Sequence, residues 1–150
     1  DLPGMTDAIL ARDIQCLTEL QLDMLACGPF IAHAQTPFAT SPNGSALKSH
    51  RVSAILRLMN PGANIPATSS LDALEKGARE QALKRGCNVI MPSFTPTQVS
   101  ADYSIYPGKN QQQHPAAERL NQVCQQIQSH GLLPSFSRGD SKRNQYVSRH

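Results

Sequence analysis

The chain has 150 residues, enough for one compact domain, and a net charge of only +3 at neutral pH. No stretch approaches the roughly 20 apolar residues that cross a membrane, and no charged and then apolar signal peptide opens the chain, so we expect a cytoplasmic or organelle-matrix protein. The 14 Lys and Arg residues are dispersed until residues 135–150, which we expect to be a solvated basic tail. The alternative is that this tail contacts nucleic acid or phosphate.

The first predicted elements are a helix, a strand and a second helix. Thr6 is a good N-cap for a helix over 6–20, where apolar residues recur at helical spacing. The apolar run 22–30 predicts a buried strand. A polar loop over 33–45 leads to a second amphipathic helix over 50–59.

The same alternation continues in the second half of the chain. A short apolar run at 63–68 predicts a second strand, and a helix over 71–86 follows, with Gly77 as its weak point. The run 87–92 predicts a third strand, and 115–131 predicts the last helix. The fold class is therefore α/β with a parallel sheet, because apolar strands alternate with amphipathic helices.

Each predicted strand runs into a proline, at Pro29, Pro66 or Pro92, and proline is tolerated at the end of a strand but not in its middle. Parallel strands that end sharply do so on the same side of the sheet, where α/β proteins carry their chemistry. Three strands cannot close a barrel, and an open sheet of three leaves two bare edges. The chain is therefore predicted to be part of something larger.

The four cysteines are too far apart for a CxxC or a CxxxCxxC cluster, which disfavours a zinc or iron–sulfur site built from this chain alone. We expect free thiols. The cysteines are Cys16, Cys27, Cys87 and Cys124.

Four motifs at the strand ends, and one at the start of the chain, suggest a family. They are DMLACGPFIAHAQTP, NIPATSS, GCNVIMPSFTP, YSIYPGK and the opening LPGMT. In this order they resemble the C-terminal half of radical S-adenosylmethionine enzymes, above all the HydE family of FeFe-hydrogenase maturases, whose relatives include biotin synthase and methylornithine synthase. The resemblance runs from residue 2 to about 143. It implies that 1–150 is one partial domain, the C-terminal part of a TIM-type (β/α) barrel with about three βα units and a C-terminal helix.

The resemblance also implies cofactors and partners. In this family a CxxxCxxC loop in the first half of the barrel binds a 4Fe-4S cluster that reduces S-adenosylmethionine, and that loop is absent here. We therefore expect the chain alone to be inactive, and assign it no catalytic or metal-binding residue. Cys124 stands alone after the YPGK motif, so we expect a buried thiol there and no second cluster. The implied partners are the N-terminal half of the barrel, a small-molecule substrate and other hydrogenase maturation proteins.

Strand-end geometry alone nominates residues 28–31, 68–70 and 91–95 for an active-site face. The resemblance implies that Thr68 and Ser69 bind a carboxylate or another anion, to which two adjacent hydroxyls near a helix start are suited. The alternative is that one of the two hydroxyls simply caps the following helix.

Met24, Pro29 and Met91 match family positions that form an apolar cavity wall. Their alternative is ordinary core packing, for which methionine is common.

Three further residues match positions near the cavity mouth. Ile31 resembles a position beside the adenine of S-adenosylmethionine, and Tyr103 and Tyr106 resemble a tyrosine pair over the mouth. The alternative for the two tyrosines is a staple within a surface loop.

Three functions remain open from the sequence. The first is a fragment of a HydE-like radical enzyme that forms the cavity wall and the anion-binding side of the barrel. The second is a fragment of a biotin synthase-like or methylornithine synthase-like enzyme. The third is a half-barrel scaffold without catalysis.

Overall fold

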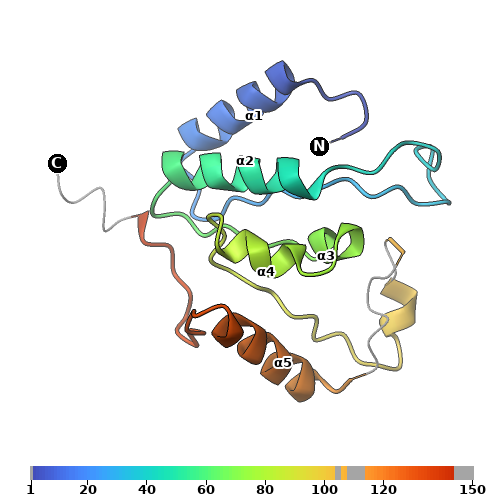
Figure 1. Cartoon of the computed structure of the whole chain (residues 1–150), viewed down its shortest axis with the longest axis vertical. Helices are drawn as coiled ribbons and strands as arrows, with labels where there is room; N and C mark the ends of the chain where they lie inside the picture. The colour runs from blue at the N-terminus through green and yellow to red at the C-terminus, as the bar shows by residue number, and fades with distance from the viewer. Residues whose placement is uncertain (1, 104–105, 108–113, 144–150) are drawn as a thin grey trace.

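The computed structural model of the chain describes residues 2–103, 106–107 and 114–143. Figure 1 shows α1 and α2 side by side, α3 and α4 below α2, and α5 farther along. The helices in these residues are α1 (Asp7–Glu19), α2 (Ala46–Met59), α3 (Ser70–Leu74), α4 (Ala78–Leu83) and α5 (Ala116–Ser129), with a 3-10 helix η1 (Ser100–Tyr103).

Side-chain caps set the starts of the first two helices. The Thr6 hydroxyl accepts a hydrogen bond from the Ile9 N–H at 3.2 Å, as predicted. The Ser45 hydroxyl accepts one from the Lys48 N–H at 3.2 Å. This second cap starts α2 at Ala46, earlier than the predicted start at 50, and so brings one more turn of helix against the core.

The single helix predicted over 71–86 is wrong, because the chain breaks at Gly77. That residue has φ +82°, a left-handed conformation that glycine adopts without steric cost. The break separates α3 from α4. The residue predicted to be the weak point of the helix is therefore the point at which it divides.

The three apolar runs predicted as strands lie next to one another in chain order. We call them the first (22–30), second (63–68) and third (87–92) extended runs. Single parallel bridges pair Met24 with Asn64 and Pro66 with Val89. The parallel order is therefore as expected, but no segment of the described residues forms a continuous strand.

Local chemistry explains why the pairing of the runs is so short. Pro66, whose backbone faces the first run, has no N–H to donate to it, whereas the backbone of Ile65 faces the third run. The Ile65 N–H donates instead to the Asn88 side-chain oxygen at 2.8 Å, and the Ile65 carbonyl accepts from both Asn88 (2.9 Å) and Val89 (3.4 Å). A side chain thus replaces one bond of the ladder.

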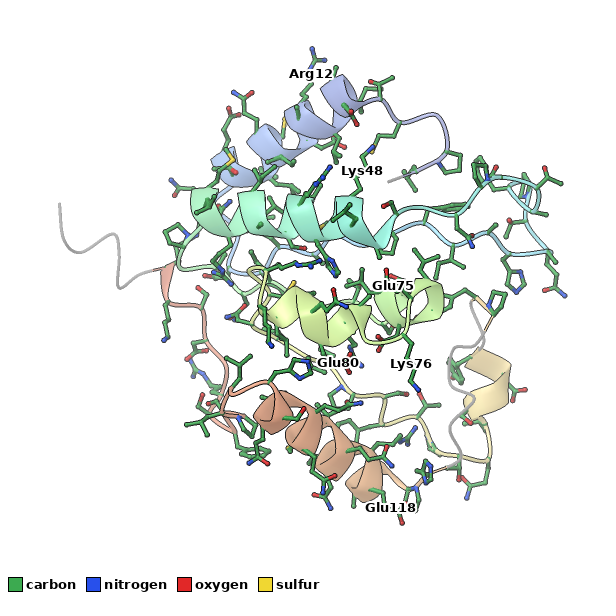
Figure 2. The ribbon with its side chains drawn as sticks, viewed as in Figure 1. Arg12, Lys48, Glu75, Lys76, Glu80 and Glu118 are labelled. Atoms are coloured by element: carbon green, nitrogen blue, oxygen red, sulfur yellow. The ribbon has the colours of Figure 1, made fainter. Side chains whose placement is uncertain are left out.

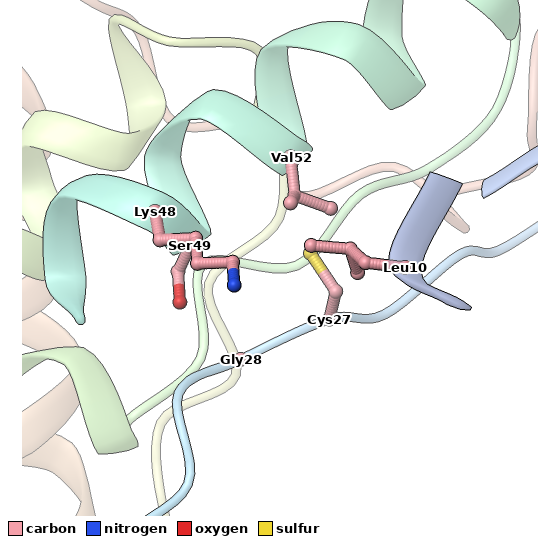
Figure 3. Close-up of a pocket in the computed structure, with 6 residues that line it drawn as sticks. All are labelled: Leu10, Cys27, Gly28, Lys48, Ser49 and Val52. Carbon is pink, nitrogen blue, oxygen red and sulfur yellow. The ribbon is translucent and has the colours of Figure 1, made fainter. Parts of the chain in front are cut away.

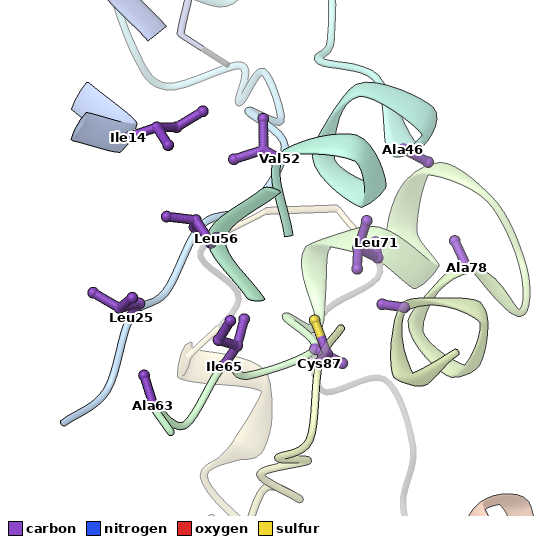
Figure 4. Packing of buried hydrophobic residues seen from close by; sticks show 12 residues of the cluster. Ile14, Leu25, Ala46, Val52, Leu56, Ala63, Ile65, Leu71, Ala78 and Cys87 are labelled. Carbon is purple, nitrogen blue, oxygen red and sulfur yellow. The ribbon is translucent and has the colours of Figure 1, made fainter. Parts of the chain in front are cut away.

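The core lies between the extended runs and the helices α1, α2, α3 and α4, as Figure 4 shows. Leu56 of α2 and Ile65 of the second run are fully buried at its centre. Burying side chains of this size contributes roughly 1.5–3 kcal/mol each. The cluster consists of Ile14, Leu25, Ala46, Val52, Leu56, Ala63, Ile65, Ala67, Leu71, Ala78, Ala82 and Cys87.

Helix α5 packs less tightly than the other long helices. Of its residues only Arg119 is buried, and the Arg119 Nη2 donates to the Thr95 carbonyl at 2.9 Å. Leu120, Val123 and Ile127 on its apolar face are half-buried. Cys124, predicted to be a buried thiol, is half-buried as well.

Part of the predicted basic tail is held against the extended runs. The Lys142 N–H donates to the Gly62 carbonyl at 2.8 Å, and the Asn64 side-chain nitrogen donates to the Gly139 carbonyl at 2.8 Å. The Ser141 hydroxyl donates to the Asp23 carboxylate. Residues 139–143 are therefore anchored, while 144–150 lie outside the described residues.

Candidate functional site

The predicted site is built where the hydroxyls that follow the second run pack against Gly28 of the first run. A Cβ added to Gly28 would lie 2.6 Å from the Thr68 Oγ1 and 3.0 Å from the Ser70 Oγ. Both distances are shorter than normal contacts, so only glycine fits opposite these hydroxyls. Gly28 therefore allows the hydroxyls after the second run to pack against the backbone of the first run.

Four hydroxyl-bearing residues gather at this point, and we call Thr68, Ser69, Ser70 and Tyr106 the hydroxyl cluster. The Thr68 and Ser70 hydroxyl oxygens are 3.1 Å apart. The Ser69 and Tyr106 hydroxyl oxygens are 2.6 Å apart, a short hydrogen bond between residues distant in sequence. The structure thus brings together three of the predicted site residues, Thr68, Ser69 and Tyr106.

The Ser69 hydroxyl does not cap the following helix, which was the alternative role considered from the sequence. Ser69 occupies the N-cap position of α3, yet its side chain makes no capping hydrogen bond. The Leu71 N–H is bonded to the Thr68 backbone carbonyl at 3.2 Å. The Ser69 hydroxyl is therefore directed to Tyr106 rather than used for the helix.

Arg79 of α4, which the sequence analysis did not single out, joins the ends of two runs beside this cluster. Its Nε donates to the Ala67 carbonyl at 3.2 Å and its Nη2 to the Met91 carbonyl at 2.9 Å. Burial lowers the pKa of the Arg79 guanidinium, and the nearby Asp72, Glu80 and Tyr106 oppose this shift. A cation is therefore fixed next to Tyr106.

The predicted wall residues divide into one buried and two exposed side chains. Pro29 is buried. The side chains of Met24 and Met91 are exposed, at 46% and 60%. Neither methionine is packed in the core of the described residues, and their place in a cavity wall stays a prediction.

The remaining site residues lie in different surroundings. Ile31 is half-buried, and Tyr103 at the end of η1 is 59% exposed. Tyr106 is half-buried. Tyr103 and Tyr106 are separated by residues outside the described part of the chain, so the structure does not report the loop that would hold them as a pair.

A small cavity lies beside the cluster, on the other side of Gly28. It measures about 20 Å³ as the space open to the centre of a water molecule, enough for about one water. Figure 3 shows its lining from α1, the first run and α2. The lining residues are Leu10, Cys27, Gly28, Lys48, Ser49 and Val52. A substrate does not fit into this cavity.

The cysteines do not offer a site for an iron–sulfur cluster. All four are free thiols, as expected, and no group of three or more His, Cys, Asp or Glu suited to a metal occurs in residues 2–103, 106–107 and 114–143. Burial raises the pKa of the Cys27 and Cys87 thiols, and Ser53 opposes this only in part. A thiol held protonated is a poor metal ligand. The residues present therefore do not fit a 4Fe-4S cluster.

The described residues offer some of the groups that could bind S-adenosylmethionine. Ile31 supplies half-buried apolar surface of the kind that an adenine ring contacts, and the hydroxyl cluster supplies polar groups.

Among the described residues, no helix has the length and the apolar character that are needed to cross a membrane.

Comparison with known proteins defines the class of the chain. No protein-family model matches it. A curated protein does match, with 41% identity over 108 residues, and this confirms the resemblance seen in the motifs: the chain belongs with the radical S-adenosylmethionine hydrogenase maturases. The matching protein is the [FeFe] hydrogenase maturase subunit HydE of Thermotoga maritima.

The match covers unequal shares of the two proteins. It covers 72% of this chain but only 31% of the Thermotoga protein. The chain thus corresponds to about a third of that relative.

Proposed function

We propose that this chain is the C-terminal part of a (β/α) barrel in a HydE-like radical S-adenosylmethionine enzyme, in which it forms the anion-binding side of the internal cavity. The observation that carries the proposal is the hydroxyl cluster at the ends of the extended runs, where the Ser69 and Tyr106 hydroxyls are 2.6 Å apart. The Ser69 hydroxyl does not cap α3, and a hydroxyl that takes part in one hydrogen bond keeps capacity for a second partner such as a ligand.

The arrangement of the runs supports the barrel. Their single bridges are parallel and join the first run to the second and the second to the third. This is the neighbour order of consecutive βα units, and the ends that carry chemistry in such folds are those that carry Thr68 and Ser69 here. Pairing partners on the outer sides of the first and third runs would come from the other half of the barrel.

The exposed methionines support the cavity wall. Met24 is the bridged residue of the first run and Met91 follows the bridged Val89 of the third by two residues, and large apolar side chains of this kind are costly to leave in water. In the proposed barrel they contact the substrate cavity, together with the buried Pro29. Tyr103 and Tyr106 cover its mouth, and Ile31 lies beside the adenine of S-adenosylmethionine.

The iron–sulfur cluster belongs to the other half of the proposed enzyme. When bound there, it supplies the electron that cleaves S-adenosylmethionine. The residues of this chain bind and orient: the hydroxyl cluster holds an anionic group of the substrate, and the apolar wall excludes water from the cavity.

The proposal is tested first on the gene and then on the protein. The reading frame upstream of Asp1 is expected to encode a CxxxCxxC loop. The protein encoded by the whole frame, reconstituted with iron and sulfide, is expected to form 5′-deoxyadenosine from S-adenosylmethionine under reducing conditions. It is also expected to bind acetate, as a minimal carboxylate, measured by calorimetry.

The variant Thr68→Val/Ser69→Ala tests the role of the cluster. Loss of two hydroxyl donors should weaken acetate binding by roughly tenfold to a hundredfold, at about 1 kcal/mol for each hydrogen bond and more where a charged group is bound. Ser41→Ala, in the loop before α2, serves as a matched hydroxyl control. A start codon immediately before Asp1 would overturn the barrel assignment, and unchanged acetate affinity in the double variant would overturn the anion site.

A further inference from the structure

Arg79 has a set of contacts that neither helix packing nor α4 stability requires. Its side chain leaves α4 and reaches two backbone carbonyls, those of Ala67 in the second run and Met91 in the third. Ala67 comes immediately before Thr68, and Met91 is the exposed methionine of the third run. One guanidinium thus sets the spacing between the hydroxyl cluster and Met91.

The same side chain retains a donor for a ligand. Within the part of the chain that the structure describes, Arg79 bonds through its backbone N–H (to the Asp72 carboxylate, 3.1 Å), its Nε and its Nη2. The Nη1 nitrogen has no hydrogen-bond partner among these residues. Since the planar guanidinium is held by two bonds, this remaining edge is pre-oriented.

The charges around Arg79 leave it able to attract an anion. Asp72, Glu80 and Tyr106 only partly oppose the lowering of the Arg79 pKa by burial, and the Asp72 carboxylate is bonded to the Arg79 backbone N–H rather than to the guanidinium. Glu80 is buried, and its Oε2 has no partner in the described structure. A guanidinium bonded only to neutral backbone carbonyls keeps its charge available to an anion in preference to a neutral molecule of the same shape.

We propose that Arg79 is a positioning residue of the anion site: it fixes the hydroxyl cluster against the third run and makes the site select a monocarboxylate over its neutral amide. This inference rests on the proposed function, because it assigns a determinant of the same anion site. It adds to that site a residue that the family resemblance did not nominate.

The experiment measures acetate and acetamide binding by calorimetry in the protein encoded by the whole reading frame. Arg79→Met removes the charge and both carbonyl contacts, and Arg79→Lys keeps the charge but cannot bond to both carbonyls. Arg79→Met should weaken acetate binding by about 30-fold or more and abolish the preference for acetate over acetamide. Arg79→Lys should keep part of that preference and lose about tenfold in affinity.

A matched control and a rescue separate positioning from misfolding. Arg12 lies on the outer surface of α1, away from the runs, as Figure 2 shows, and Arg12→Met should leave acetate binding unchanged. Millimolar guanidinium ion should restore part of the acetate affinity to the folded Arg79→Met variant. A melting temperature close to that of the parent protein establishes that this variant is folded.

The outcomes distinguish the inference from the proposal on which it rests. If the parent protein does not bind acetate, or Thr68→Val/Ser69→Ala has no effect, the anion site itself is wrong. If that double variant loses acetate while Arg79→Met keeps both the affinity and the acetate preference within twofold, the site stands and the role of Arg79 is refuted. Loss of acetate and acetamide binding in equal proportion in Arg79→Met also refutes selection by charge.

Discussion

Arg57 of α2 is the side chain whose loss we expect to damage the fold most. It donates hydrogen bonds to α2's own end, to the loop after it and to the start of the third run, so it ties three segments together at the end of the runs opposite the hydroxyl cluster. The acceptors are the carbonyls of Gly86 (2.8 Å), Asn60 (3.3 Å), Pro61 (3.0 Å) and Ala63 (2.7 Å) and the Asn88 Oδ1 (2.8 Å).

The magnitude follows from the number and type of these bonds. A hydrogen bond to a charged group contributes about 1.5–3 kcal/mol, but the Arg57 side chain is only half-buried and water can reach part of its acceptors. We therefore expect Arg57→Met to lower the free energy of unfolding by about 2–4 kcal/mol. Asn88 would also lose the partner that orients its side chain toward the Ile65 N–H.

Urea unfolding followed by far-UV circular dichroism measures this loss, at one low concentration for all variants so that self-association contributes equally. With a typical slope of about 2 kcal/mol per molar urea, the midpoint should fall by roughly 1–2 M. Arg51→Met is the matched control, because Arg51 is exposed on the same helix, and it should change the free energy by less than about 0.5 kcal/mol. Arg57→Lys should fall between the two. An Arg57→Met variant as stable as Arg51→Met would refute the idea that Arg57 ties the three segments together.

Four further predictions concern the first run, the thiols and an iron–sulfur cluster. Gly28→Ala should destabilise by about 1–3 kcal/mol, because its Cβ would meet Thr68, and adding Thr68→Ala should recover at least part of this loss in a double-mutant cycle; purely additive effects would contradict the close contact. Because burial raises the pKa of Cys27 and Cys87, the free energy of unfolding should be at its full value below the ordinary thiol pKa of 9.0 and should decline as the pH rises above it. The measurement is the urea midpoint at low and at high pH. A parent chain whose midpoint changes with pH no more than that of a Cys27→Ala/Cys87→Ala variant would contradict this prediction. The exposed Cys16 should react with a thiol reagent at once, whereas Cys87 should react only on unfolding. The 150-residue chain incubated with iron and sulfide should show neither 4Fe-4S absorbance nor a reduced-cluster spin signal, and a cluster with three protein thiolates would contradict the absence of a ligand set.

The helices were predictable where a local signal sets their ends. The hydroxyl of Thr6 and the glycine at 77 act through their own backbone, so the sequence carries the information directly. The start of α2 was missed because Ser45 closes a polar loop and its capping role depends on how that loop returns to the core. The strands were overestimated, since apolar composition cannot reveal that the Asn88 side chain replaces a backbone acceptor.

The site was predictable only in part, for a similar reason. The resemblance nominated Ser69 and Tyr106, and the structure brings their hydroxyls together. Arg79 was missed because it acts on backbone carbonyls, which every sequence position has, so no residue pattern marks its targets. The available signal was its position, a basic residue in the helix that directly follows the second run.

Burial along the extended runs argues that they are completed by neighbours outside the described chain. In the second run Ile65 is 0% exposed, whereas Met24 in the first run is 46% exposed and Met91 in the third is 60% exposed. The middle run is thus packed as core, whereas each outer run combines a buried residue, Leu25 or Cys87, with an exposed methionine. An autonomous sheet would place polar residues at such positions, because each exposed methionine forgoes roughly 1.5–3 kcal/mol of burial. The same two methionines are the ones that the family resemblance assigned to a cavity wall, so the barrel that we propose would account for both their identity and their exposure in this chain.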